Sequence, residues 1–181
     1  MADQEAIDEL VDKMTQQRDT LLAQIESISD EAASIEPPDG EGEGQWSVKQ
    51  QCAHLAEMET AYRSWVRRGL AEDNPDVTAD RGERVPISLE DANGHSIAEL
   101  TKQLRDQRGV TLELIESMQP EDFDRTATQR MFGTLTLLQW LRSYYRHDRM
   151  HADQVAGREP EYKPRFAGGG AEPDQRRVKT T

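Results

Sequence analysis

The feature that most constrains the fold is a series of four long segments in which apolar residues recur every three or four positions. This spacing is typical of amphipathic helices that pack on one another. The first segment runs from about residue 3 to residue 35. The other three begin at Ser47, Ser96 and Thr136, each followed three residues later by Gln or Glu in a capping-box pattern. The last ends near Gly157, a typical helix terminator. We therefore expect an all-α fold, a four-helix bundle.

Between the second and third segments lies an acidic, irregular stretch from Ala71 to His95. Connections in tight helical hairpins usually take about 2–8 residues, whereas at about 3.3 Å per residue this stretch could cross the full length of a bundle. Such a crossover lets the third helix run in the same direction as the second. The resulting order is up-down-down-up, in which the second and fourth helices are antiparallel.

Three of the four histidines support this topology. His147 and His151 are four residues apart, so one helical turn places both rings on one face of the last helix. His54 lies near the start of the second helix, and the pair lies near the end of the fourth. In antiparallel helices all three rings meet at one height, whereas in parallel helices the rise of 1.5 Å per residue separates His54 from the pair by about 9 Å. The long crossover and the three-histidine cluster therefore support one another.

Three neutral imidazoles are suitable ligands for a divalent metal, and they leave a coordination position open, as catalytic zinc sites do. Zinc, nickel, copper and iron all accept imidazole ligands, and zinc and nickel are the first candidates here. A metal at this position could bind water or the thiol of a small cofactor and lower its pKa. The alternative for each histidine is a core or boundary position with a single hydrogen bond. For three rings at one level, we favour the metal.

Four further residues of the second and fourth helices each have two interpretations. Asp148 and Glu59 fall on the inward side of their helices, where a carboxylate is costly unless it is paired. They could orient a ligand imidazole, or they could pair with an arginine from another helix. Trp140 and Tyr144 could line a substrate pocket, although aromatic residues at these positions are more often part of the core. All four are therefore candidates for the surroundings of the metal.

Composition limits the classes of function. The 181 residues suit one bundle domain over residues 1–160, followed by a polar tail over residues 161–181. A net charge of -13 argues against sequence-independent binding to nucleic acid or to an anionic membrane surface. No apolar run approaches the length of a membrane span, and the acidic N-terminus is unlike a signal peptide. With a single cysteine, Cys52, these features favour the cytoplasm.

Two segments resemble the DinB-like superfamily. Residues 46–59, which contain Trp-Ser and later His54-Leu, are similar to its Trp-Ser…His-Leu…Glu segment. Residues 132–155, which end in His147-x-x-x-His151, resemble its last helix. The resemblance implies an up-down-down-up four-helix bundle, often dimeric, whose metal is held by three histidines, here His54, His147 and His151. The superfamily includes thiol-S-transferases and a maleylpyruvate isomerase that use low-molecular-weight thiols, and also stress-induced members of unknown activity.

The function that we favour from the sequence is a metal-dependent transferase or isomerase that uses a small thiol on an electrophilic small-molecule substrate. The alternative is a non-enzymatic metal-binding protein of the stress response, or an interaction module. A pocket rich in lysine or arginine at the open metal position would favour the enzyme, because thiol cofactors and their adducts carry carboxylates. The resemblance, together with the broad apolar band of the first helix, also predicts a homodimer.

Overall fold

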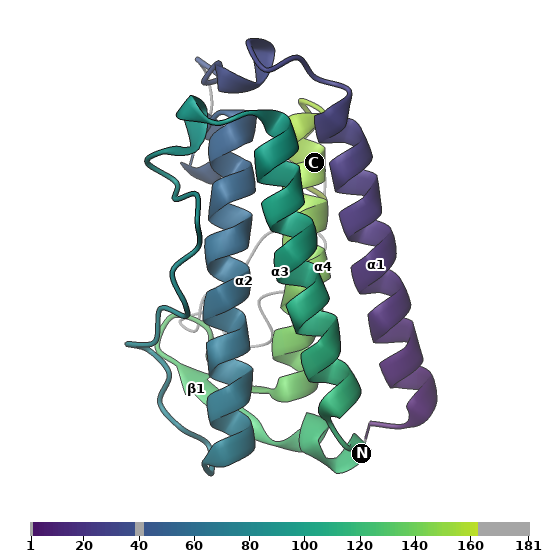
Figure 1. Cartoon of the computed structure of the whole chain (residues 1–181). Coiled ribbons are helices and arrows are strands. Elements are labelled where there is room, and N and C mark those ends of the chain that lie inside the picture. The colour runs from purple at the N-terminus through teal and green to yellow at the C-terminus, as the bar shows by residue number, and fades with distance from the viewer. Residues whose placement is uncertain (1, 39–41, 163–181) are drawn as a thin grey trace.

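The computed structural model describes residues 2–38 and 42–162, and four long helices dominate it (Figure 1). They are α1 (Gln4–Glu26), α2 (Val48–Ala71), α3 (Ile97–Ser117) and α4 (Leu137–Val155). Helices α1 and α4 run in one direction and α2 and α3 in the other, so the predicted up-down-down-up bundle is confirmed. None of the helices in the described ranges is long and apolar enough to cross a membrane. Most of the predicted tail, from residue 163 onward, lies outside the described residues.

Three of the four helices begin at the caps that the sequence predicts. The hydroxyls of Ser47, Ser96 and Thr136 each accept a hydrogen bond from the backbone N–H three residues later. The Gln or Glu at that position accepts a bond from the backbone N–H of the cap in return. These pairs satisfy donors that the first helical turn leaves without partners. Helix α4 ends before Gly157, whose φ of +66° favours glycine.

Helix α1 is shorter than the sequence predicted. It ends at Glu26, not near residue 35, because Ser27 caps it and donates its hydroxyl to the Gln24 carbonyl at 2.6 Å. The serines that follow make similar local bonds to the backbone. Such bonds compete with helical hydrogen bonding. The apolar spacing that suggested a longer helix extends to Ile28, which packs against the core from the turn that follows α1.

The connection between α2 and α3, residues 72–96, runs back along α2 and is called the strap below (Figure 1). Near its start, the Val77 N–H donates to the Thr128 carbonyl at 2.9 Å. Further along, the Gln103 side chain bonds both the N–H and the carbonyl of Ile87, at 2.8 and 2.9 Å. The strap therefore has a fixed path, and it starts α3 at the same end of the bundle as α2.

The connection between α3 and α4 contains a small antiparallel hairpin that the sequence analysis did not identify. Its strands are β1 (Thr126–Gln129) and β2 (Gly133–Thr136). Ala127 and Leu135 are buried in the core, and the Trp140 indole donates to the Ala127 carbonyl at 3.2 Å. The hairpin closes one end of the bundle and leads directly into α4.

A network of four buried charges, one from each helix, lies at the centre of the bundle. Arg18 of α1 lies between the two acids: its Nη2 is 2.7 Å from Oε2 of Glu59 in α2 and 2.8 Å from Oδ1 of Asp148 in α4. Arg108 of α3 bonds the same two carboxylates at 2.8 and 2.9 Å. Two positive and two negative charges balance, and the exposed fractions of Glu59 and Asp148 are only 2% and 0%.

The remaining polar atoms of this charge network also have partners. Arg18 Nη1 donates to the Leu104 carbonyl at 2.7 Å, and Arg108 Nη1 donates to the Met14 carbonyl. The Thr111 hydroxyl lies 2.7 Å from Oε1 of Glu59. A buried ion pair offsets its desolvation only when its hydrogen bonds are complete. The network meets that condition, so we expect the loss of any one member to be costly.

We predict that Asp148→Asn lowers the free energy of unfolding by about 3–5 kcal/mol, because it leaves two buried guanidinium groups with one carboxylate. Urea denaturation followed by circular dichroism measures this. The matched control is Asp106→Asn on α3, whose exposed pair with Lys102 should contribute less than about 1 kcal/mol. Equal stabilities for the two variants would contradict the importance of the network.

The same network predicts a dependence of stability on acid. Burial alone would raise the pKa of Glu59, but Arg108 and Arg18 hold it at about 2, below the ordinary value of 4.5. The unfolded chain therefore binds a proton more readily than the fold does. The stabilisation from Glu59 should be complete above pH 4.5 and decrease as pH falls toward 2. Denaturation across this range should show a smaller decrease for Glu59→Gln; equal pH profiles for variant and parent would contradict the assignment.

Candidate metal centre

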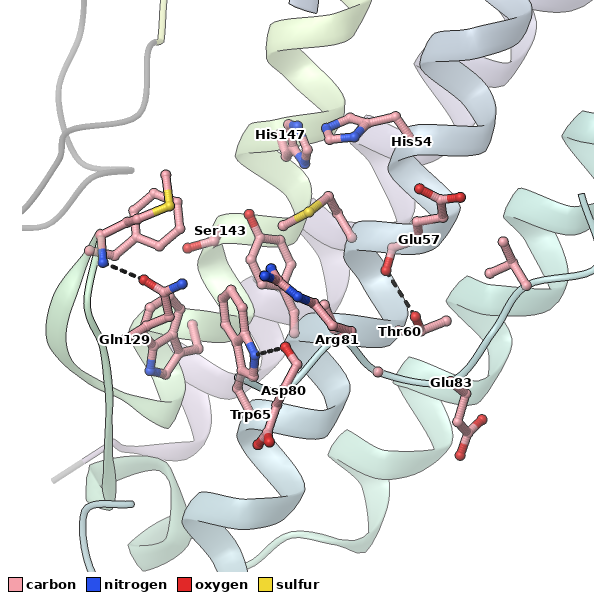
Figure 2. A pocket seen from close by; sticks show the side chains of 18 of the residues that line it. His54, Glu57, Thr60, Trp65, Asp80, Arg81, Glu83, Gln129, Ser143 and His147 are labelled. Atoms are coloured by element: carbon pink, nitrogen blue, oxygen red, sulfur yellow. Dashed lines mark hydrogen bonds between the residues drawn. The ribbon is translucent and has the colours of Figure 1, made fainter. Parts of the chain in front are cut away.

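Three histidine rings converge where the start of α2 lies beside the end of α4. Ring centroids of His54 and His147 are 5.1 Å apart, those of His54 and His151 are 5.6 Å apart, and those of the α4 pair are 4.7 Å apart. Figure 2 shows His54 and His147 reaching toward one another from the two helices. The antiparallel arrangement thus brings all three predicted ligands to one height.

A carboxylate that the sequence analysis missed completes the cluster. Glu43 lies in the short turn Gly42–Gln45 that precedes α2. One of its oxygens is 3.3 Å from Nε2 of His54, and the other is 3.5 Å from Nε2 of both His147 and His151. In the sequence, only its position shortly before the helix that carries His54 points to Glu43. The glycine- and proline-rich stretch around it otherwise indicates nothing more than a break between helices.

The distances suit a metal ion. The ligand atoms of the four residues all lie within 4.8 Å of one another, and the Nε2 atoms of His147 and His151 are 3.1 Å apart. Ligands about 2.0–2.2 Å from one tetrahedral ion lie roughly 3.3–3.6 Å from each other. Three imidazoles and a carboxylate are also a donor set that zinc and neighbouring divalent ions accept. The cluster therefore could hold one divalent metal ion without a large rearrangement.

A glutamine on α2 orients one of the rings. Nδ1 of His151 is 3.1 Å from the side-chain oxygen of Gln51, and the amide nitrogen of Gln51 donates to the Trp46 carbonyl at 3.1 Å. Because that carbonyl fixes which way the amide faces, His151 carries its proton on Nδ1 and directs the lone pair of Nε2 into the cluster. Partners of this kind fix the tautomer of metal-binding histidines and strengthen them as ligands.

Electrostatics favour the charge states that bind metal. Burial lowers the pKa of His151 well below its usual range, and His147 and His54 lower it further. Burial also lowers the pKa of His54. For Glu43, burial alone would raise the pKa, but the adjacent His147 and His54 hold it well below its usual range. At neutral pH, His54 and His151 are therefore neutral and Glu43 is ionised, as ligation requires.

The predicted surroundings of the metal need correction. Asp148 and Glu59 do not orient a ligand imidazole; both bond Arg18 and Arg108, which is the other interpretation that the sequence allowed. The reason is geometric, since Asp148 is about 100° from His147 around α4 and faces the bundle axis, where the arginines lie. The side chain that orients His151 is instead Gln51, which the sequence analysis did not identify.

A cavity of about 600 Å³ adjoins the cluster, and Glu43, His54 and His147 line it. Its volume is in the range of small-molecule sites. Trp140 lines this cavity and also packs in the core, whereas Tyr144 belongs to the core alone. The walls come from α2, α4, the strap and the hairpin, and part of this lining is drawn in Figure 2. Much of the lining is apolar or aromatic, and it includes Met58, Tyr62, Trp65, Met131, Phe132 and Met150.

Comparison with known families agrees with this geometry. The family model described as the DinB superfamily matches residues 13–155. The chain belongs to the DinB superfamily. A protein of similar sequence, the uncharacterized protein YuaE of Bacillus subtilis (strain 168), is 24% identical over 143 residues, which are 73% of this chain and 86% of YuaE. The four-helix bundle and its histidine cluster thus belong to a chain of DinB type.

Solved structures show the same fold. YfiT from Bacillus subtilis, described as a probable metal-dependent hydrolase with an unusual four-helix bundle topology, aligns with a TM-score of 0.68 at 18% identity over 87% of each chain. A mutant of the mycothiol-dependent maleylpyruvate isomerase aligns with a TM-score of 0.61 at 9% identity, over 82% of this chain and 60% of the isomerase. At these identities the likeness shows the DinB-type fold alone.

We predict that Gln51→Leu weakens zinc binding by about 10- to 100-fold, because His151 loses the acceptor that fixes its tautomer. Competition with a chromophoric chelator measures the affinity. The matched control is Gln16→Leu on α1, an exposed position outside the cluster, which should bind zinc as the parent does. An unchanged affinity in the Gln51 variant would show that its hydrogen bond does not orient a ligand.

Proposed function

We propose that this DinB-type protein is a metal-dependent transferase that joins a small thiol to an electrophilic substrate. In this proposal His54, His147 and His151 hold one divalent ion, with zinc and nickel as the first candidates. The observation that carries the proposal is the position of the cluster. Glu43, His54 and His147 of the cluster border a cavity large enough for a small molecule, whereas purely structural metal sites are closed by protein on all sides.

Each part of the site has a role in such a reaction. A bound divalent ion would lower the pKa of a thiol so that the thiolate exists near neutral pH. Glu43, whose carboxylate is ionised and lies beside all three rings, accepts the thiol proton. The thiolate sulfur then forms a bond to the electrophilic carbon, and the leaving group departs with the electron pair of the bond that breaks. The apolar wall of the cavity holds the substrate and excludes water.

The names of the structural neighbours are consistent with this class of chemistry. One is described as a probable metal-dependent hydrolase and the other as a mycothiol-dependent isomerase. Hydrolysis consumes water, and the second description names a small thiol on which the isomerase depends. We favour the thiol here because the cavity lining includes Arg84 and Arg146, and thiol cofactors carry carboxylates that arginine binds well.

A non-enzymatic role is the second candidate, and Glu43 is the observation that favours it. With this carboxylate as a fourth protein ligand the metal site would be closed, as structural zinc sites are. The two candidates differ in what Glu43 does. As a proton acceptor it contributes little to metal affinity, whereas as the fourth ligand it contributes much.

We expect zinc- or nickel-loaded protein to conjugate bacillithiol, mycothiol or cysteine to monochlorobimane, measured by fluorescence. In this reaction a sulfur–carbon bond forms and chloride leaves. A chelator should remove the activity. Glu43→Gln should keep metal affinity within about tenfold and slow conjugation by about 100-fold or more. His147→Ala should lose both metal and activity while circular dichroism shows unchanged helical content.

Two results would contradict the proposal. If the loaded protein binds one metal per chain but conjugates none of these thiols, and Glu43→Gln loses its metal, the non-enzymatic role is correct. If His147→Ala binds zinc and nickel as tightly as the parent, the histidine cluster is not the metal site. The predicted homodimer is separate from both outcomes and stays a prediction.

A further inference from the structure

One segment of the strap, Asp80-Arg81-Gly82, borders the cavity with a charge that the metal chemistry does not use. Figure 2 shows the Arg81 side chain extending from the strap into the space below His54 and His147. Among the residues that the structure describes, the Arg81 guanidinium has no hydrogen-bond or ion-pair partner. Arginine side chains usually bind carboxylates or other acceptors. This cation is therefore available to a ligand.

Both neighbours of Arg81 are fixed to α2. The Trp65 indole donates to the Asp80 carbonyl at 3.1 Å, and Arg68 binds the Asp80 carboxylate at 3.2 Å. Gly82 has a φ of +73°, and a Cβ there would lie only 2.3–2.4 Å from backbone atoms of Thr60 and its successor. Only glycine fits this position. The segment that carries Arg81 is therefore held in place before any ligand arrives, which lowers the entropic cost of binding.

The acidic residues of the cavity have partners other than Arg81. Figure 2 shows the Glu83 side chain directed away from the centre of the cavity, and its carboxylate binds Arg67. The carboxylate of Glu57 accepts the N–H of Leu89 at 3.0 Å. Asp80 binds Arg68, and Glu43 faces the histidines. None of these four carboxylates forms an ion pair with Arg81, and Arg84 adds a second cation to the lining.

The surroundings of Arg81 define the rest of the ligand. The cavity wall next to it is aromatic and apolar, with Trp65, Phe132 and Trp140 in mutual ring contact at 5.0–6.4 Å. The protein as a whole carries a net charge of -13, which repels anions at a distance. An anion enters this site only if a local cation compensates that repulsion. Arg81 supplies that charge beside an apolar wall.

We infer that the cavity binds a small molecule with an apolar body and a carboxylate, with the carboxylate on Arg81 and the body against the aromatic wall. That this molecule is the substrate rests on the proposed function, because the end of the molecule opposite the carboxylate then lies toward the metal centre. The binding itself requires no metal. Arg81 is then the residue that selects acids over neutral molecules of the same shape.

The test compares phenylpropionate with its uncharged amide on the chelator-treated, nitrogen-15-labelled full chain. The indole N–H resonance of Trp65 reports on the end of the cavity near Arg81, because that N–H donates to the carbonyl of the adjacent Asp80. We expect phenylpropionate to shift this resonance with a dissociation constant at least about tenfold below that of the amide, as a charge-assisted bond provides. Arg81→Gln should abolish the preference, and Arg81→Lys should keep part of it.

The control variant is Arg105→Gln, an exposed arginine on α3 that pairs with Glu26 away from the cavity, and it should keep the full preference. Equal binding of acid and amide by the parent, or an unchanged preference in Arg81→Gln, would overturn the inference. Zinc titration separates this from the proposed function, since the Trp46 ring lies 4.7 Å from that of His54 and reports on the metal end. If zinc does not shift the Trp46 resonance, the result contradicts metal binding in the proposed function and leaves the inference about Arg81 intact.

Discussion

The structure depends on the buried charge network of Arg18, Glu59, Arg108 and Asp148, which takes one residue from each helix. Because each charge is stable in the core only with its partners, the four helices must adopt one rotation and one height together. Asp148 lies between His147 and His151, in the turn of α4 that presents the two rings. The rotation of α4 that places Asp148 on the bundle axis therefore also directs His147 and His151 toward α2, where His54 lies at the same level.

The strap is the second constraint, and it acts on both topology and chemistry. Its length allows α3 to run parallel to α2, which makes α2 and α4 antiparallel and brings the histidines together. Its path along α2 also forms one wall of the cavity. The contact of Gly82 with the α2 backbone then holds Arg81 at that wall. A single connection thus determines where the histidine cluster forms and which charge lines the cavity beside it.

Local signals explain what the sequence could predict. The capping boxes at Ser47, Ser96 and Thr136 depend on residues only three positions apart. The sequence therefore predicted the first residues of these three helices correctly. The height of the histidines followed from counting residues between helix ends. The predicted end of α1 was wrong because the apolar spacing continues past Ser27. The hydrogen bond from the Ser27 side chain to the backbone ends the helix there.

The missed features depend on contacts between distant segments. Glu43 reaches the cluster from a turn with no helical period, so only the folded chain shows which groups it faces. The inward position of Asp148 indicated that its carboxylate needs a charged partner, and many arginines could supply one. Only the packing of α1 and α3 selects Arg18 and Arg108. The orienting role of Gln51 likewise requires the position of His151 on another helix.

X-ray absorption spectroscopy of the zinc-loaded protein tests the central claim most directly, because it reports the atoms around the ion. We expect one zinc per chain with only nitrogen and oxygen ligands at about 2.0–2.2 Å and the outer-shell scattering of imidazole rings. Sulfur should be absent from the first coordination sphere, since Cys52 is buried in the core and burial raises the pKa of its thiol to about 12. A zinc–sulfur distance near 2.3 Å, or a spectrum unchanged by His147→Ala, would contradict the account.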